Sequence, residues 1–129
     1  MGLLLDTHSL IWFFADSSNL SDTGCNLMEN PINQKLISLA SVWEMAIKQS
    51  KGKLTLPLSL EPYIEAKTQL EYFTILPINL KHLSLVSNLP FHHNDPFNRL
   101  LIAQAMIEKI PILSRDSIFD KYNINRIWN

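Results

Sequence analysis

Four acidic residues lie where short apolar runs give way to helical segments. Asp6 follows one run directly, and Glu44 lies on the helical segment after a second run. Asp95 precedes the helical segment 96–107, and Asp116 follows the strand segment 111–113. Parallel strands end at the edge where the following helices begin, so these carboxylates are expected to converge. Clustered carboxylates repel one another unless a cation neutralises them, and Mg²⁺ or Mn²⁺ suits such an all-oxygen pocket. The pattern therefore predicts a metal site that activates water for phosphodiester hydrolysis.

Each of these acids also has a structural explanation. Glu44 lies three residues after Ser41, the spacing of a capping box in which the glutamate reaches back to the cap backbone. Asp95 stands directly before Pro96, a helix start signal, and Asp116 has the position of a cap for a short following helix. Taken singly, each acid is explained as well by structure as by function. The shared position at strand ends is what favours the metal site.

Short apolar runs alternate with helical segments along the chain. The expected strands cover residues 3–5, 36–39, 73–76, 111–113 and 124–128. The expected helices cover residues 10–14, 21–29, 42–52, 60–71, 80–87, 96–107 and 118–122. Such alternation implies right-handed crossovers between parallel strands, with helices on both faces of the sheet. We therefore expect an α/β fold, a three-layer α/β/α sandwich with a mainly parallel central sheet.

Composition sets the broad class of the protein. The 129 residues, 47% of them hydrophobic, suffice for one domain over residues 1–129 with a real core. A net charge of -1 gives no general attraction to nucleic acid or anionic lipid, so a polyanion would be held by a local patch or by metal. The lone Cys25 forms no internal disulfide and is expected to be a packed thiol. With neither a signal segment nor a long apolar run, the expectation is a soluble cytoplasmic protein with no membrane contact.

Segments from all parts of the chain match one known pattern together. They are LLLDTH at the start, SVWEMAIK, HHNDPFNRLLIAQA and ILSRDSIFDKY near the end. On these segments the chain resembles the PIN-domain nucleases, and within them the VapC-like toxins of type II toxin–antitoxin pairs. The resemblance implies a PIN-like fold and a Mg²⁺- or Mn²⁺-dependent ribonuclease with Asp6, Glu44 and Asp116 as acids, plus one or two from residues 92–116. It also implies an antitoxin partner and, commonly, a homodimer.

One position departs from this family pattern. Many relatives with this segment read DPFDR, whereas this chain reads DPFNR, which places Asn98 where an acid is usual. Asn98 keeps an oxygen that can bind metal but lacks a negative charge, so metal affinity should fall. Asp95, three residues earlier, lies on nearly the same helix face and partly compensates. The expected metal ligands are therefore Asp6, Asp95, Asn98 and Asp116.

Asn98 supports a second hypothesis for the function. In this hypothesis the chain is a PIN-fold binding module that engages an antitoxin but has lost useful catalysis. A third class, phosphotransfer of the receiver or haloacid-dehalogenase type, is less favoured. The dehalogenase pattern needs a second Asp two residues after the first, where this chain has His8, and the Asp and Lys of a receiver are not found.

Polar and basic residues beside the acids are candidates for the RNA phosphate. Arg99 and Arg115 are the preferred contacts, with pairing to a carboxylate as the alternative for either. Thr7 and Ser114 are further candidates, although turn capping explains those two equally well. Three lysines, Lys48, Lys51 and Lys53, either follow an RNA backbone or, as we favour, form a solvated helix end.

Histidine and aromatic residues give weaker signals. His92 and His93 are a poor metal pair because adjacent side chains diverge, and His8 is expected to be packed or to line the pocket. The aromatic cluster at residues 12–14 and Trp43 are expected mostly in the core, with any exposed part available to an antitoxin helix.

Overall fold

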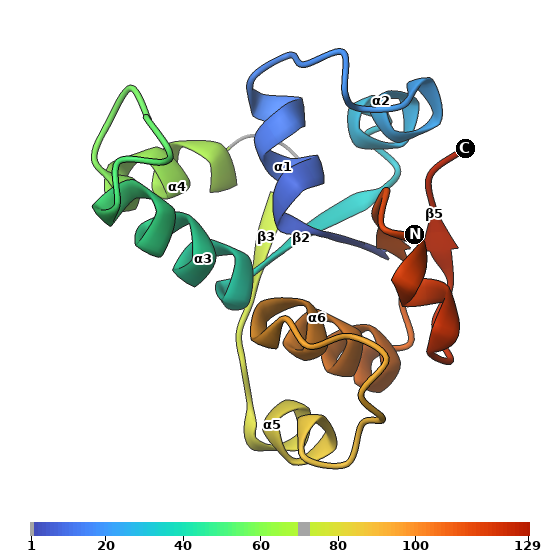
Figure 1. Ribbon diagram of the computed structural model, residues 1–129. Helices are drawn as coiled ribbons and strands as arrows, with labels where there is room; N and C mark the ends of the chain where they lie inside the picture. The colour runs from blue at the N-terminus through green and yellow to red at the C-terminus, as the bar shows by residue number, and fades with distance from the viewer. Residues whose placement is uncertain (1, 70–72) are drawn as a thin grey trace.

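A single sheet of five parallel strands runs through the centre of the molecule (Figure 1). The computed structural model describes residues 2–69 and 73–129. The strand order is β3-β2-β1-β4-β5, so the first strand of the chain is the central one. Leu4 of β1 pairs with Leu36 on one side and with Ile112 on the other. The strands are β1 (Gly2–Leu5), β2 (Gln34–Ser38), β3 (Phe73–Leu76), β4 (Ile112–Leu113) and β5 (Arg126–Ile127).

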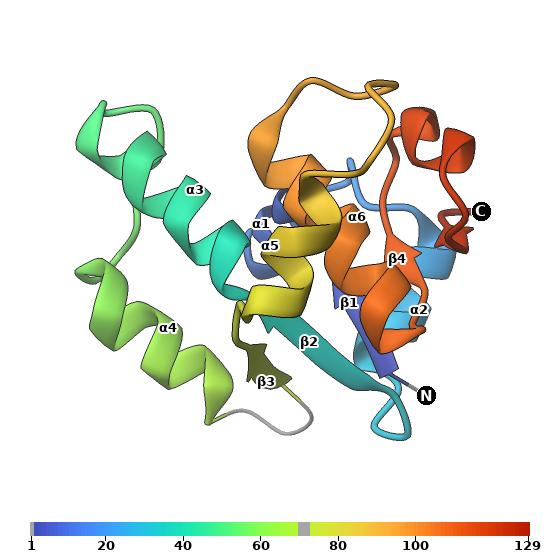
Figure 2. The same ribbon diagram turned by 90° about the horizontal axis from the view of Figure 1, so that it is seen from below.

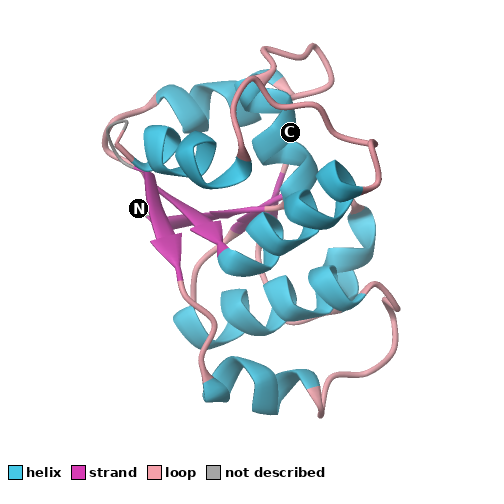
Figure 3. Ribbon diagram, turned by 90° about the vertical axis from the view of Figure 1, so that its left-hand side faces the viewer, coloured by secondary structure: helices cyan, strands magenta, loops and turns pink. Residues whose placement is uncertain are grey.

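Helices cover both faces of the sheet, which confirms the expected three-layer α/β/α sandwich (Figures 1 and 3). One face carries α1 (Thr7–Phe14), α2 (Asp22–Glu29), α4 (Leu60–Thr68) and most of α3 (Leu39–Ser50). The other carries α5 (Leu80–Val86), α6 (Pro96–Glu108) and the 3-10 helix η1 (Ser117–Lys121).

Two apolar clusters hold the layers together, and β1 contributes to both. Leu3 and Leu5 belong to the cluster under α1, α2 and α4, whereas Leu4 belongs to the cluster under α5 and α6. All three leucines are 0% exposed. Successive residues of a strand point to opposite faces of the sheet, so the continuous run of leucines fits a strand that is buried on both sides.

Side-chain caps fix where the helices begin. Asp6 caps α1 and Asp95 caps α6 with Pro96 in the first turn, as the sequence predicted for the latter. The predicted capping box between Ser41 and Glu44 is wrong, because α3 begins at Leu39 and its cap is Ser38. The first helix likewise begins at Thr7 rather than at residue 10, because the Asp6 side chain accepts the Ser9 N–H and closes the first turn.

The ends of the elements agree with the sequence predictions to within a few residues. Gly52 adopts a positive φ of 71° just beyond Lys51, the C-cap of α3, which is the left-handed geometry expected of a glycine stop. The helix predicted over residues 60–71 ends at Thr68, and residues 70–72 of that prediction lie outside the described residues. The predicted terminal strand over 124–128 is shorter, with only Arg126 and Ile127 paired to β4. Over the described chain, no helix is both long enough and apolar enough to span a membrane.

Candidate metal and active site

Asp6 lies at the point where β1 ends and α1 begins. Its Oδ1 accepts the N–H of Ser9 at 2.7 Å, and its Oδ2 accepts the hydroxyl of Ser114 at 2.6 Å. The residue is 5% exposed. The carboxylate is therefore fixed from two directions, once by the helix that it caps and once by the end of the neighbouring strand β4.

Ser114 joins Asp6 to Asp116. The Ser114 hydroxyl donates to Asp6, and its oxygen accepts the N–H of Asp116 at 3.0 Å. Ser114 is fully buried, and its contact with a substrate phosphate stays a prediction. In the structure it sets the relative positions of two carboxylates that lie on neighbouring strand ends.

Asp116 is the better exposed of these two acids, with 37% of its side chain accessible. Its Oδ1 accepts the N–H of Ile118 at 3.0 Å, which confirms the predicted role as a cap, here of η1. Its Oδ2 lies 3.2 Å from Nε2 of His93. Capping therefore uses one oxygen and leaves the other directed at the segment before α6.

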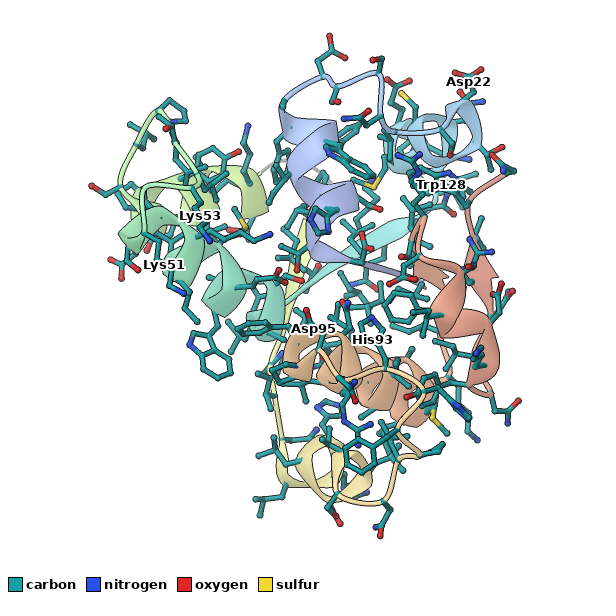
Figure 4. All side chains as sticks on the ribbon, in the orientation of Figure 1. Asp22, Lys51, Lys53, His93, Asp95 and Trp128 are labelled. Atoms are coloured by element: carbon teal, nitrogen blue, oxygen red, sulfur yellow. The ribbon has the colours of Figure 1, made fainter. Side chains whose placement is uncertain are left out.

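His93 connects Asp116 to the start of α6. Its Nε2 also lies 2.9 Å from the side-chain amide of Asn98, and its Nδ1 accepts the N–H of Asp95 at 3.2 Å. Asp95 Oδ1 accepts the N–H groups of Phe97 and Asn98. Figure 4 shows His93 and Asp95 close together near the start of α6. One continuous set of contacts, here called the acidic network, therefore links six residues, in part through backbone N–H groups: Asp6, Ser114, Asp116, His93, Asn98 and Asp95.

A pocket of about 240 Å³ opens beside the acidic network. Asp6 and Asp116 line it together with His8, Trp12 and Arg115. The His8 and Trp12 rings lie 5.7 Å apart, which confirms His8 as a pocket-lining residue. Arg115 is exposed, so its guanidinium is placed to meet an anion that enters the pocket.

Glu44 is separate from the acidic network. It lies on α3, where its carboxylate pairs with Lys48 one turn later at 3.2 Å. The described residues contain no group of three or more His, Cys, Asp or Glu side chains arranged to hold a metal ion. The structure thus brings Asp6 and Asp116 to one pocket and links Asp95 and Asn98 to them, but it does not bring in Glu44.

Two of the residues predicted to contact phosphate are buried and hydrogen bonded to protein groups, and their phosphate role stays a prediction. Arg99 is 5% exposed, and its guanidinium donates to four carbonyl oxygens, those of Val86, Leu89, Pro90 and His93. Thr7 is 2% exposed and donates to the hydroxyl of Ser41 at 3.0 Å, which joins α1 to α3.

The basic cluster and the aromatic residues are divided between surface and core. Figure 4 places Lys51 and Lys53 at the outer end of α3, away from Asp95, in agreement with a solvated helix end. Trp43, expected mostly in the core, is 55% exposed and packs edge-on against Phe97 with ring centroids 4.8 Å apart. Trp12 is half-buried beside the pocket.

The thiol of Cys25 is not activated. Its hydrogen bond to the Glu29 carboxylate, at 3.3 Å, is the main reason that its pKa is raised above the ordinary value, and partial burial adds to the effect. A raised pKa keeps the thiol protonated at neutral pH, which disfavours nucleophilic chemistry.

The residue that sequence reasoning missed is His93. The sequence suggested only a weak metal pair of His92 and His93. In the structure the His93 ring instead contacts Asn98 and Asp116. The spacing from His93 to Asp95 was visible, but the fold of the segment before α6 was not, because that segment has no helical or strand periodicity.

Comparisons with known proteins agree on one fold. The family model of the PIN domain matches residues 3–125. Solved structures with the same fold include VapBC2 from Rickettsia felis bound to a promoter DNA fragment, with TM-score 0.74, 13% identity and 100% of both chains covered. FitAcB from Neisseria gonorrhoeae matches with TM-score 0.68 and 14% identity over 98% of this chain and 96% of that chain. VapBC-1 from nontypeable Haemophilus influenzae matches with TM-score 0.69 and 13% identity over 98% and 97%. The comparison with curated proteins gives no match.

Proposed function

The chain belongs to the PIN-domain family, and from that premise we propose that it is a metal-dependent ribonuclease and the toxin of a toxin–antitoxin pair. Members of this family are typically nucleases and generally depend on metal. The observation that carries the proposal is the hydrogen bond between Asp6 and Ser114, residues 108 positions apart, which places Asp6 and Asp116 at one pocket.

The donor set of the acidic network suits Mg²⁺ or Mn²⁺. Asp6, Asp116, Asp95 and Asn98 offer carboxylate and amide oxygens, the ligand types that hard divalent cations prefer. Each carboxylate oxygen has two lone pairs, so the hydrogen bonds to Asp6 and Asp116 still leave lone pairs for a cation. When bound there, the metal would supply activation of water and neutralisation of phosphate charge.

Residues at the pocket mouth provide the features that an RNA strand needs. Arg115 lies beside Asp6 and Asp116 and is placed to bind a phosphate oxygen next to the reacting one. Trp12 and His8 line the same pocket and offer aromatic faces on which an unpaired base stacks. This combination supports a single-stranded stretch of RNA as the substrate.

An exposed apolar strip on α3 supports an antitoxin partner. Leu39 and Trp43 lie four residues apart on one helix face and are 40% and 55% exposed, and Phe97 of α6 extends the strip. Contiguous exposed apolar side chains favour a partner helix. One of the matched structures is described as a toxin–antitoxin complex from Klebsiella pneumoniae. We also propose a homodimer, as the resemblance to VapC-like toxins implies.

RNA cleavage by the purified chain tests the proposal. We expect cleavage of single-stranded RNA in Mn²⁺ or Mg²⁺, none in EDTA, and loss of cleavage in Asp6→Asn and in Asp116→Asn. Lys53→Gln, at the outer end of α3, serves as a surface control that keeps activity. Full cleavage in EDTA would overturn the metal-dependent mechanism.

Asn98 favours a second candidate, a binding module of the same fold that has lost useful catalysis. The position offers an amide in place of the carboxylate that is usual in the family, so the metal site has one negative charge fewer. A tight antitoxin complex combined with no Mn²⁺ binding by calorimetry would favour the module over the nuclease.

A further inference from the structure

We propose that His93 is a positioning residue of the metal site, in which a single N–H group at Nε2 holds both the Asp116 carboxylate and the Asn98 side chain in place. The inference rests on the proposed metal site, but it begins from contacts that do not involve a metal. Nε2 lies 3.2 Å from Oδ2 of Asp116 and 2.9 Å from the side-chain amide of Asn98.

The backbone of Asp95 determines which ring nitrogen of His93 carries the proton. Its N–H donates to Nδ1 at 3.2 Å, so Nδ1 must act as an acceptor and cannot itself bear hydrogen. In the neutral ring the proton is then on Nε2, where it can be donated to the Asp116 carboxylate. If the proton were on Nδ1, that N–H would face the N–H of Asp95. The lone pair of Nε2 would then face the lone pairs of the Asp116 carboxylate.

The same proton determines the orientation of the Asn98 amide. An Nε2–H group next to an NH₂ group would be two donors face to face, whereas the amide oxygen in that place accepts the bond. Oxygen and nitrogen of an amide are assigned from their hydrogen bonds, so we assign Oδ1 of Asn98 to the atom 2.9 Å from His93. With that assignment all three contacts of the imidazole are satisfied. Asn98 is thereby committed to offer an oxygen toward the acidic network.

The backbone around His93 is held firmly enough for this role. Figure 2 shows the segment between α5 and α6 passing beside η1 before α6 begins. The His93 N–H donates to the Tyr122 hydroxyl at 2.9 Å, and that hydroxyl donates to Pro90 O at 2.7 Å. Arg99 donates to the carbonyls of Pro90 and His93 from the other side. The segment is thus fixed by hydrogen bonds although it has no regular secondary structure.

A positioned pair of oxygens explains how the site functions with Asn98. A carboxylate at position 98 would attract the cation by charge, whereas a neutral amide binds well only if its oxygen is already directed at the metal. Groups that hold metal ligands by hydrogen bonds typically affect metal affinity by roughly 10- to 100-fold. His93, with 13% of its side chain exposed, supplies such a hydrogen bond to two expected ligands at once.

Nitrogen NMR tests the proton assignment without any metal. In ¹⁵N-labelled full-length protein in EDTA, long-range proton–nitrogen correlations should show His93 in the Nε2–H form, with the exposed His92 as an internal reference for a solvated ring. An Nδ1–H form of His93 would overturn the proposal.

Mn²⁺ titration tests the positioning role. We expect His93→Leu to weaken Mn²⁺ binding roughly 10- to 100-fold by calorimetry, His93→Gln to recover part of the loss through its amide N–H, and His92→Leu to change it less than about twofold. Thermal unfolding in EDTA shows whether each variant is folded. Unchanged or tighter Mn²⁺ binding in folded His93→Leu would overturn the positioning role while leaving the metal-dependent nuclease intact. A wild-type chain that binds no Mn²⁺ would instead overturn the proposed function, and the metal role of His93 with it.

Discussion

The acidic network and the Glu44–Lys48 pair hold their carboxylates in different ways. In the network, Asp6, Asp116 and Asp95 each accept hydrogen bonds from the backbone N–H groups of helices that they cap. Glu44 instead pairs with a lysine that is 28% exposed and that must be ordered along its whole length. Capping fixes a carboxylate before any ligand arrives, whereas Glu44 is held only by a long, partly exposed lysine side chain. The network is thus organised in advance, and Glu44 is not part of it.

The largest expected difference concerns RNA cleavage. Asp116→Asn should lower the rate more than about a hundredfold, beyond the effect typical of groups that merely hold metal ligands, because it removes a charged ligand that is already in place. Glu44→Gln should lower it by about tenfold. Single-turnover cleavage of a labelled RNA in Mn²⁺ measures both. Equal losses would show that the two carboxylates contribute alike and that prior organisation is irrelevant.

A second difference concerns stability. Arg99→Met should lower the free energy of unfolding by about 3 kcal/mol, because it leaves buried carbonyls of the segment before α6 without a donor. Lys48→Met should lower it by only about 0.3–0.5 kcal/mol, since it removes one i,i+4 ion pair. Urea unfolding followed by circular dichroism gives both values. A loss below about 1 kcal/mol for Arg99→Met would mean that water replaces the guanidinium.

A third difference concerns the charge at position 98. Asn98→Asp should tighten Mn²⁺ binding by about tenfold, a fraction of the roughly 4 kcal/mol by which two unit charges interact at 4 Å near a protein surface. Glu44→Asp, which shortens a side chain outside the network, is the matched control and should not tighten binding. Calorimetry without RNA measures both. No gain in Asn98→Asp would show that position 98 does not face the metal.

The smallest expected effect lies at the exposed pair beyond the network. The Arg126 guanidinium, hydrogen bonded to Asp120 at 2.9 Å, holds the pKa of that carboxyl below its usual range. A lowered folded-state pKa adds stability above the unfolded-state pKa of about 3.9, and this contribution is lost as the pH falls through the lowered folded-state pKa. Asp120→Asn should therefore be slightly less stable than wild type at pH 7 and equal to it at about pH 2. Thermal unfolding of both proteins between pH 2 and pH 7 measures this difference in stability. A difference that persists in acid, or that does not change in 1 M salt, would contradict an ionic interaction between Asp120 and Arg126.

The sequence was informative where a local pattern decides the structure. The leucines of β1, the Asp95–Pro96 start of α6 and the glycine after α3 each act over a few residues, and each was predicted correctly. The start of α3 was not, because Ser38 and Ser41 are both suitable caps, and Ser38 is the one used, with its hydroxyl accepting the Ala40 N–H and donating to Gln104 of α6.

The convergence of Asp6 and Asp116 was predictable from the sequence, but the contacts that connect them were not. Strand-end positions indicated Asp6 and Asp116, whereas the hydroxyl of Ser114 and the ring of His93 join them through contacts between distant parts of the chain. Arg99 shows the same limit. Its place beside Asn98 suggested a phosphate contact, but the guanidinium donates to four backbone carbonyls of residues 86–93. The direction in which a helical side chain points depends on the elements that pack beside the helix, which the spacing of residues in the sequence does not reveal.

The central place of β1 has a consequence for folding of the chain. β1 must wait for β4, because Leu4 pairs with Ile112 and Asp6 bonds to Ser114, partners that lie more than a hundred residues later in the sequence. Contacts of such separation form late in folding, since a long loop must close before they contribute. The pocket therefore assembles only when the two ends of this long loop have come together, and a partly folded chain lacks it.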